Sequence, residues 1–276
     1  MPLNKGAIAA AAAAASAAAL LYRREQHYRR ISERLAAAAL ETLLNAIDAN
    51  DATTGAHVRR VATYALILAD AAGLPKHDRK VVEHVALFHD IGKIHEALFD
   101  IIHDDKKLTP AERRAIATHP LRGAKVLSPL RSFYPELQEG VLSHHERWDG
   151  TGYPRRLKGR RIPISARIVA IADTFDAVTH SRRYRPAQSI GMGRRVILEG
   201  RGTQFDPELV DLFVIPPVFD RIVAAAETMK HWREPVHQRS SGRDEENVPD
   251  ITFRWRPARR GGPARPAPAR VRRATR

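Results

Sequence analysis

Cysteine is absent from this chain of 276 residues. Its absence excludes disulfide bonds, thiolate metal sites and a cysteine nucleophile. Any bound metal must therefore be held by imidazole and carboxylate groups, a donor set that suits iron, manganese or zinc. Thirteen histidines supply ample imidazole. A metal site in this protein is thus expected to combine histidine with acidic side chains.

Acidic residues are scarce at the two ends of the chain. Residues 254–276 contain nine arginines and no acid, and residues 1–34 carry a net charge of +4, out of +15 for the whole sequence. Residues 35–253 therefore carry only about +2. Because the basic character belongs to the ends, the high net charge does not predict a nucleic-acid-binding body. No specific nucleic-acid partner is expected.

A long hydrophobic run is also missing. The most apolar stretch, residues 6–21, is nearly all alanine and is shorter than the roughly 20 residues that span a bilayer. Alanine is the best helix former, so a helix is expected here. The basic flanks are Lys5 on one side and Arg23 and Arg24 on the other. Three interpretations stay open: a weak membrane anchor with its basic side in the cytoplasm, a low-complexity soluble helix, or a secretory signal.

Helical periodicity dominates the remaining sequence, and no run of alternating polar and apolar residues indicates a strand. Residues 22–47 are expected to form a leading helix, followed by a turn at 51–55. Thr109, Pro110 and Glu112 have the pattern of a helix start. Further helices are predicted at 57–72, 79–89, 120–128, 135–145, 166–180 and 207–214. The predicted fold class is all-α.

The composition changes near residue 234. Residues 216–239 are predicted to form a C-terminal helical extension. Residues 240–276 are rich in Arg, Pro, Ala and Gly and too poor in aliphatic side chains to offset the entropy of ordering, so they are expected to be disordered. Simple solvation of this tail is the first interpretation. A weak contact with RNA, lipid headgroups or an acidic partner is the alternative.

Two short motifs carry most of the chemistry. Residues 89–93 are His-Asp-Ile-Gly-Lys, and residues 144–154 are His-His-Glu-Arg-Trp-Asp-Gly-Thr-Gly-Tyr-Pro. His57, His119 and Asp173 also lie near apolar helices. Each alone would more often be a structural residue. Five such positions in one all-α body indicate a shared metal centre.

Such a centre suits phosphodiester cleavage. Two adjacent ions can hold a deprotonated water at neutral pH and clamp the phosphate under attack. An aspartate can bridge both ions, and Gly92 permits a close approach of the chain. Lys93 shares a helical face with His89 if the helix continues, and its ammonium can neutralise charge on a phosphoryl oxygen. Charge neutralisation and positioning are the main requirements of this reaction.

Residues 48–215, about 60% of the chain, resemble the HD-GYP domain, a bacterial branch of the HD phosphohydrolases that degrades cyclic di-GMP. The resemblance rests on motifs that occur in order: Thr54-Gly55-Ala56-His57, residues 89–93, His119-Pro120, residues 144–154, 166–177, 182–185 and 202–209. It implies an HD-type helical bundle with a dinuclear metal site. The implied cofactors are two divalent ions, iron or manganese.

The resemblance also implies the roles of single residues. It assigns metal ligation to His57, His89, Asp90, His119, His144, His145 and Asp173. Asp90 is the bridging carboxylate, and with Lys93 at the scissile phosphate it forms the catalytic pair. Tyr153, Arg182 and Arg185 match substrate-binding positions, the two arginines as phosphate ligands. Asp176, one helical turn after Asp173, is a candidate partner of a metal ligand, with packing or capping as the alternative.

Two departures from the family pattern limit these expectations. Some members carry a glutamate four residues before the first histidine, in a form associated with a third metal; here that position is Thr53. A threonine hydroxyl is a poor substitute, and Asp48 and Asp51 have the wrong spacing, so no third metal is expected. After the His-Asp-Ile-Gly-Lys motif, residues 94–97 are Ile-His-Glu-Ala. The cleft wall should therefore differ, and His95 is expected to line the cleft or surface rather than bind metal.

The predicted function is metal-dependent hydrolysis of cyclic di-GMP to pGpG, with GMP as the alternative end product. Hydrolysis of another cyclic dinucleotide, or non-catalytic nucleotide binding by a signalling scaffold, are the alternatives. The expected location is the cytoplasm, at the membrane face if residues 6–21 act as an anchor. The leading helix at 22–47 is a candidate for homodimer formation. No sensory domain is expected, because too few residues precede the match.

Overall fold

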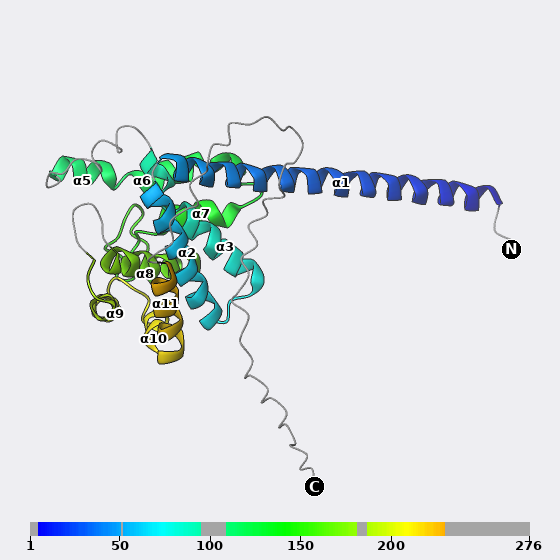
Figure 1. Cartoon of the computed structure of the whole chain (residues 1–276). Helices are drawn as coiled ribbons and strands as arrows, with labels where there is room; N and C mark the ends of the chain where they lie inside the picture. The colour runs from blue at the N-terminus through cyan, green and yellow to red at the C-terminus, as the bar shows by residue number, and fades with distance from the viewer. Residues whose placement is uncertain (1–4, 51, 95–108, 181–186, 230–276) are drawn as a thin grey trace, which may run out of the picture. The chain divides into compact units, whose positions relative to one another are not determined.

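The computed structural model describes residues 5–50, 52–94, 109–180 and 187–229 (Figure 1). All of them belong to one compact unit, residues 1–233. Several predictions concern residues outside this described part: those on Arg182, Arg185, His95 and Asp51, and on the tail at 240–276.

The regular secondary structure of the described residues is helical, with one isolated bridge between Arg201 and Phe205 as their only β-type pairing. The α-helices are α1 (Lys5–Asn50), α2 (Ala52–Ala71), α3 (Lys76–Phe88), α5 (Pro110–Ile116), α6 (His119–Val126), α7 (Pro135–Ser143), α8 (Ile164–Thr179), α9 (Ile190–Glu199), α10 (Pro207–Val214) and α11 (Pro216–Met229). Three short 3-10 helices are η1 (Ile91–Ile94), η2 (Ser128–Leu130) and η3 (Gly159–Arg161). The all-α prediction is confirmed.

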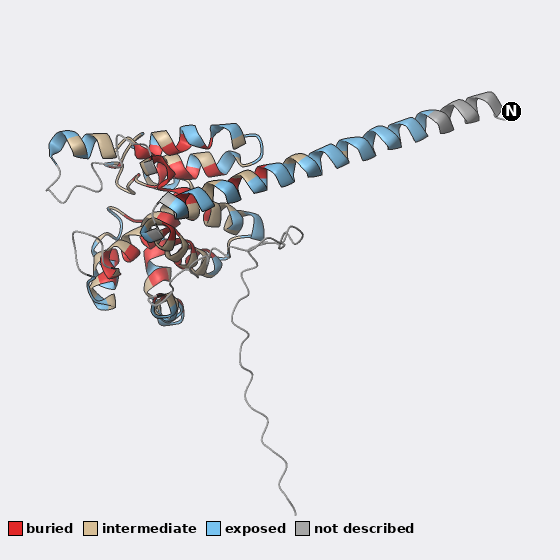
Figure 2. Cartoon of the chain, turned by 45° about the horizontal axis from the view of Figure 1, so that its top comes forward, coloured by how far each residue is buried: buried red, intermediate tan, exposed pale blue. Residues whose placement is uncertain are grey.

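Helix α2 is the centre of the bundle. It packs against α1, α3, α8 and α11 (Figure 1). Val58, Val61, Ala65 and Leu68 recur at helical spacing on its buried face. Figure 2 shows the buried residues gathered where these helices meet. This packing places His57, near the start of α2, beside the ends of α3 and α8.

The start of α2 corrects the predicted turn at 51–55. Residues 52–55 are already helical, and Gly55 is buried. Thr53, Thr54 and Gly55 have weak helix propensities, but propensity is only a weak prior that tertiary packing overrides. The Gly55 carbonyl accepts a hydrogen bond from Arg59 Nη1 at 3.2 Å, inside the helix.

Helix α1 joins the predicted alanine-rich helix and the predicted leading helix into one element. Ala36, Leu40 and Ile47 are buried in its second half, whereas Leu20, Leu21 and other apolar residues of its first half are exposed (Figure 2). No described helix combines the length and the hydropathy that crossing a membrane requires. Membrane attachment and homodimer formation through this helix stay predictions.

Helix α5 begins as its sequence predicts. The Thr109 side chain accepts a hydrogen bond from the Glu112 backbone N–H at 3.2 Å, and the Glu112 carboxylate accepts one from the Thr109 N–H at 2.6 Å. Pro110 occupies the first helical position. This capping box satisfies N–H groups that a helix start otherwise leaves unpaired.

Candidate metal centre

Three histidines at helix ends have the same orientation. His89 and His144 cap the C-termini of α3 and α7, and His119 is the first residue of α6. Each places Nδ1 2.7–2.8 Å from the carbonyl oxygen of the residue three positions earlier. A carbonyl only accepts hydrogen bonds, so each Nδ1 carries the proton. Each Nε2 therefore presents a lone pair, the tautomer that a metal-binding histidine requires.

These lone pairs converge on one another. The Nε2 atoms of His119 and His144 lie 3.1 Å apart. With both protons on Nδ1, two acceptors face each other with no hydrogen between them. The buried Nε2 atoms of His57 and His89 and the buried Oδ1 of Asp90 have no hydrogen-bond partner in the described structure. Acceptors gathered in this way fit a divalent cation, so the residues present suit the metal that the donor set predicts.

Asp90 lies at the point where two ligand groups meet. Its Oδ1 is 3.3 Å from His119 Nε2 and 4.0 Å from His144 Nε2, whereas its Oδ2 is 3.5 Å from His89 Nε2 and 4.0 Å from His57 Nε2. The first group with metal-binding geometry is Asp90, His119, His144 and His145, and the second is His57, His89 and Asp90. The shared carboxylate is the one predicted to bridge two ions.

The charge states of the centre also suit a metal. Burial lowers the pKa of His89, lowers that of His144 well below its usual value, and lowers that of His145 to about 3. These imidazoles are therefore neutral near pH 7. Burial by itself would raise the pKa of Asp90, but Lys93 and His89 together hold it well below the usual value. An ionised carboxylate thus faces neutral imidazoles.

Asp173 completes the predicted ligand set. It lies on α8, and its Oδ1 is 3.4 Å from His57 Nε2 and 4.0 Å from His89 Nε2. The seven predicted ligands thus come from five helices, α2, α3, α6, α7 and α8, or from the residues that directly follow them. The structure brings all seven to one place.

Asp176 holds His57 from behind the centre. His57 Nδ1 donates to Asp176 Oδ2 at 2.7 Å. Arg60 donates to both carboxylate oxygens, from Nε to Oδ1 at 2.7 Å and from Nη2 to Oδ2 at 3.0 Å. His180 Nδ1 lies 3.1 Å from Oδ1. Burial would raise the pKa of Asp176, but hydrogen bonds from His180, His57 and Arg60 lower it. Asp176 therefore forms the predicted contact with a predicted metal ligand, His57.

Sequence reasoning did not single out Arg60 or His180. Arg60 lies three residues after His57 on the same helix, and His180 lies four after Asp176. Both spacings place side chains on one helical face, which is the signal that could have found them. Neither residue belongs to a recognisable motif by itself.

Asp176→Asn should weaken metal retention. The amide keeps an acceptor for His57 but removes the charge that neutralises half-buried Arg60. Loss of a partner that orients a ligand typically lowers metal affinity about 10–100-fold. We expect the variant to lose metal at chelator concentrations that the parent tolerates, measured as metal per chain after dialysis. Asp211→Asn, at an exposed aspartate paired with Arg201, is the control; equal retention by all three proteins would contradict the prediction.

The chain leaves the α-helix between His89 and Lys93. Helix α3 ends at Phe88 and η1 covers Ile91–Ile94, so Lys93 does not share a continued helical face with His89. Instead, Lys93 Nζ donates to Asp90 Oδ2 at 2.6 Å. Gly92 explains the change of path. A Cβ on Gly92 would lie 2.1 Å from the His119 carbonyl oxygen, so only glycine allows η1 and α6 to meet.

Glu146 organises the Gly-Tyr-Pro loop. Its buried carboxylate accepts hydrogen bonds from the Arg155 and Leu157 backbone N–H groups at 2.7 and 2.9 Å. The Tyr153 ring, in the same loop, stacks on His145 with centroids 4.9 Å apart. Burial raises the pKa of Tyr153, so its phenol stays protonated and able to donate. The carboxylate of the motif is therefore a loop anchor, and Tyr153 lies beside a predicted ligand.

Glu146→Ala should loosen this loop. The substitution leaves two backbone N–H groups without their acceptor, which we expect to cost about 1–3 kcal/mol in the free energy of unfolding. Glu139→Ala is the matched control, because Glu139 is exposed and its carboxylate bonds no described residue other than Arg155. Denaturant melts of the three proteins measure the difference. Equal losses for both variants would contradict an anchoring role for Glu146.

Comparison with known proteins agrees with this geometry. The HD domain family matches residues 41–209. The chain belongs to the HD domain family. The match covers every predicted metal ligand and ends within the predicted boundaries of the catalytic domain. It confirms the family that the His-Asp and Gly-Tyr-Pro motifs predict.

Several relatives are phosphodiesterases by name. The chain is 36% identical over 201 residues to 3'3'-cGAMP-specific phosphodiesterase 2 of Vibrio cholerae, covering 72% of this chain and 35% of that protein. It is 35% identical over 207 residues to a cyclic di-GMP phosphodiesterase of the same organism, covering 70% and 41%. A cyclic di-GMP phosphodiesterase of Thermotoga maritima is 36% identical over 218 residues, covering 76% and 58%. The chain thus spans only part of each relative.

A solved structure shares the fold. The crystal structure of a cyclic GMP-AMP specific phosphodiesterase of Vibrio cholerae superposes with a TM-score of 0.50 at 21% identity, covering 69% of this chain and 51% of that one. At this identity the similarity concerns the fold alone. The HD-type helical bundle is therefore confirmed.

Proposed function

We propose that this chain is a metal-dependent phosphodiesterase that hydrolyses cyclic di-GMP. The observation that carries the proposal is the convergence of histidine Nε2 lone pairs on the two oxygens of Asp90. Such a cluster of unprotonated acceptors has no structural use in a helical bundle, because buried acceptors without partners are costly. The names of the relatives support a cyclic dinucleotide as substrate.

Two divalent ions, iron or manganese, are the proposed cofactors. The proposed ligands are His57, His89, Asp90, His119, His144, His145 and Asp173, with Asp90 common to both ions. When bound, the ions would supply a deprotonated water and neutralise phosphate charge. A third ion is not proposed, since Thr53 lacks a carboxylate.

The chain's own residues would orient and neutralise the substrate. The Lys93 ammonium, half-buried beside Asp90, is placed to offset charge on the phosphate. Tyr153 forms a wall next to His145 and can donate a hydrogen bond from its phenol. Arg182 and Arg185 are proposed to hold the remaining phosphate charge. Addition of water at phosphorus and departure of the ribose oxygen would yield linear pGpG; a second hydrolysis would yield GMP.

A second candidate substrate follows from the relatives. Cyclic GMP-AMP phosphodiesterases and cyclic di-GMP phosphodiesterases match this chain at similar identity. The metal ligands determine the bond that is cleaved, whereas contacts with the bases determine which cyclic dinucleotide fits. Hydrolysis of 3'3'-cGAMP is therefore the alternative. A non-catalytic scaffold that binds the nucleotide is the other alternative.

Product analysis tests the proposal. Purified full-length protein, reconstituted with iron or manganese, is incubated with cyclic di-GMP, 3'3'-cGAMP and cyclic di-AMP, and the products are separated by chromatography. We expect pGpG to appear first from cyclic di-GMP, at a higher kcat/KM than the other two substrates allow. A faster reaction with 3'3'-cGAMP would establish the alternative substrate. If folded, metal-loaded protein hydrolyses none of the three nucleotides, the phosphodiesterase proposal is wrong and the non-catalytic scaffold remains.

A further inference from the structure

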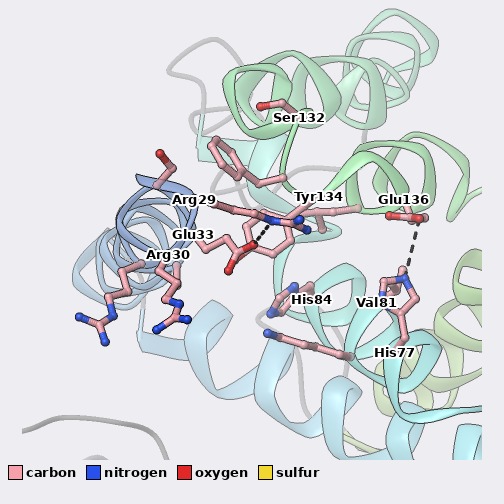
Figure 3. A pocket seen from close by; sticks show the side chains of 15 residues that line it. Arg29, Arg30, Glu33, His77, Val81, His84, Ser132, Tyr134 and Glu136 are labelled. Carbon is pink, nitrogen blue, oxygen red and sulfur yellow. Dashed lines mark hydrogen bonds and ion pairs between the residues drawn. The ribbon is translucent and has the colours of Figure 1, made fainter. Parts of the chain in front are cut away.

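A pocket away from the metal centre lies between α1, α3 and the segment that leads into the first turn of α7 (Figure 3). Its volume is about 970 Å³, at the upper end of the range of about 300–1,000 Å³ for small-molecule sites. His84 in its lining precedes His89 by five residues, about 7 Å along the helix. Leu137 precedes His144 by seven, about 10 Å. The pocket therefore shares α3 and α7 with the metal centre without including a predicted ligand.

The floor of the pocket is neutral and aromatic. The rings of His84 and Tyr134 pack edge to face with centroids 5.3 Å apart, and Figure 3 shows His84 below Tyr134. Burial lowers the pKa of His84 to about 4, so its ring is uncharged near pH 7. Val81 and the buried Leu137 add apolar surface. On the rim, the Phe133 side chain is exposed. These rings present flat surface to an occupant.

The rim of the pocket is cationic. Its four Arg and Lys residues against two Glu residues leave a net charge of +2. Arg29 is neutralised by Glu33, at 3.0 Å (Figure 3). Arg30 and Arg34 form no hydrogen bond or ion pair with any acid in the described part of the chain, and Lys80 forms none either, although it interacts electrostatically with Glu83 three residues further along α3. Their charge is available to an anion.

We propose that this pocket binds a phosphorylated nucleotide, with its base against Tyr134 and Phe133 and its phosphates held by Arg34 and Lys80. Guanidinium and ammonium groups are the usual phosphate ligands of proteins. Bases stack on aromatic side chains whatever their sequence, for about 1–3 kcal/mol per base. A simple anion would leave the aromatic floor unused, and an apolar ligand would leave the rim unused. The proposed site goes beyond the phosphodiesterase function, because it includes no residue of the metal centre.

Calorimetric titration of the full-length protein, freed of metal by a chelator, tests the proposal with GTP and ATP as probes. We expect binding at low ionic strength that weakens with added salt. Arg34→Glu combined with Lys80→Glu should weaken it at least about tenfold, because two attractive charges become repulsive. Arg23→Glu makes the same kind of change on an exposed position of α1 outside the pocket and should alter the Kd less than about twofold. Circular dichroism checks that each variant is folded.

Inorganic tripolyphosphate and Phe133→Ala test the role of the base. We expect tripolyphosphate to bind more weakly than GTP, and Phe133→Ala to weaken GTP but not tripolyphosphate. The proposal is overturned if neither nucleotide binds the folded parent protein, or if the double charge reversal leaves the Kd unchanged. Tripolyphosphate that binds as tightly as GTP would overturn it too. The proposal is also overturned if phosphatidylserine vesicles bind the protein through Arg34 and Lys80 and nucleotides do not bind.

Discussion

Asp90→Ala should abolish hydrolysis of cyclic di-GMP and remove metal from both ligand groups. Asp90 is the only residue common to the two groups, so its loss takes a ligand from each. His89 belongs to one group alone, so His89→Ala should empty that group first. We expect kcat to fall at least about a thousandfold in both variants, because charge neutralisation and the activated water depend on the ions.

Metal content distinguishes the two variants more sharply than activity does. Elemental analysis after reconstitution should find almost no bound metal in Asp90→Ala and a partial loss in His89→Ala. His27→Ala, at an exposed histidine of α1, is the control and should keep full activity. Equal metal content in Asp90→Ala and the parent would contradict the bridging role. Under the scaffold alternative, both variants would keep their cellular effect.

Gly92→Ala should destabilise the protein and displace His119. The added Cβ would lie 2.1 Å from the His119 carbonyl oxygen and 2.6 Å from the Gly123 nitrogen, both backbone atoms that cannot swing aside. Helix α6 must therefore move away from η1. Overpacking of this kind costs about 1–3 kcal/mol and sometimes more. Urea denaturation of the metal-free protein measures this loss, and metal analysis should show weaker retention at the group that contains His119.

Gly191→Ala is the matched control. The added Cβ there would meet only the Ser189 hydroxyl, at 3.8 Å, and alanine is the better helix former at the start of α9. This variant should be as stable as the parent or slightly more stable. A Gly92→Ala protein with unchanged stability and metal content would show that the contact between η1 and α6 is not tight.

Local patterns were sufficient for many elements of this fold. The predicted helix at 207–214 agrees with α10, and the Thr109 capping box has both predicted hydrogen bonds. These features depend on contacts within a few residues, which the sequence displays directly. Helix α9 was not predicted, because Gly191 and Gly193 in its first turn have weak helix propensity. The predicted turn at 51–55 failed because burial of Gly55 and the packing of α2 outweigh weak propensity.

For the metal centre, the sequence by itself determined which donor types are available and the chemistry they suit, and through the resemblance it predicted which residues are the ligands. Only the tertiary structure decided which ligands share Asp90, because that depends on distances between α2, α3, α6, α7 and α8. It also revealed the tautomers and the support of His57 by Asp176 and Arg60. The contacts that support His57 join side chains more than a hundred residues apart, and no periodicity along the chain encodes them.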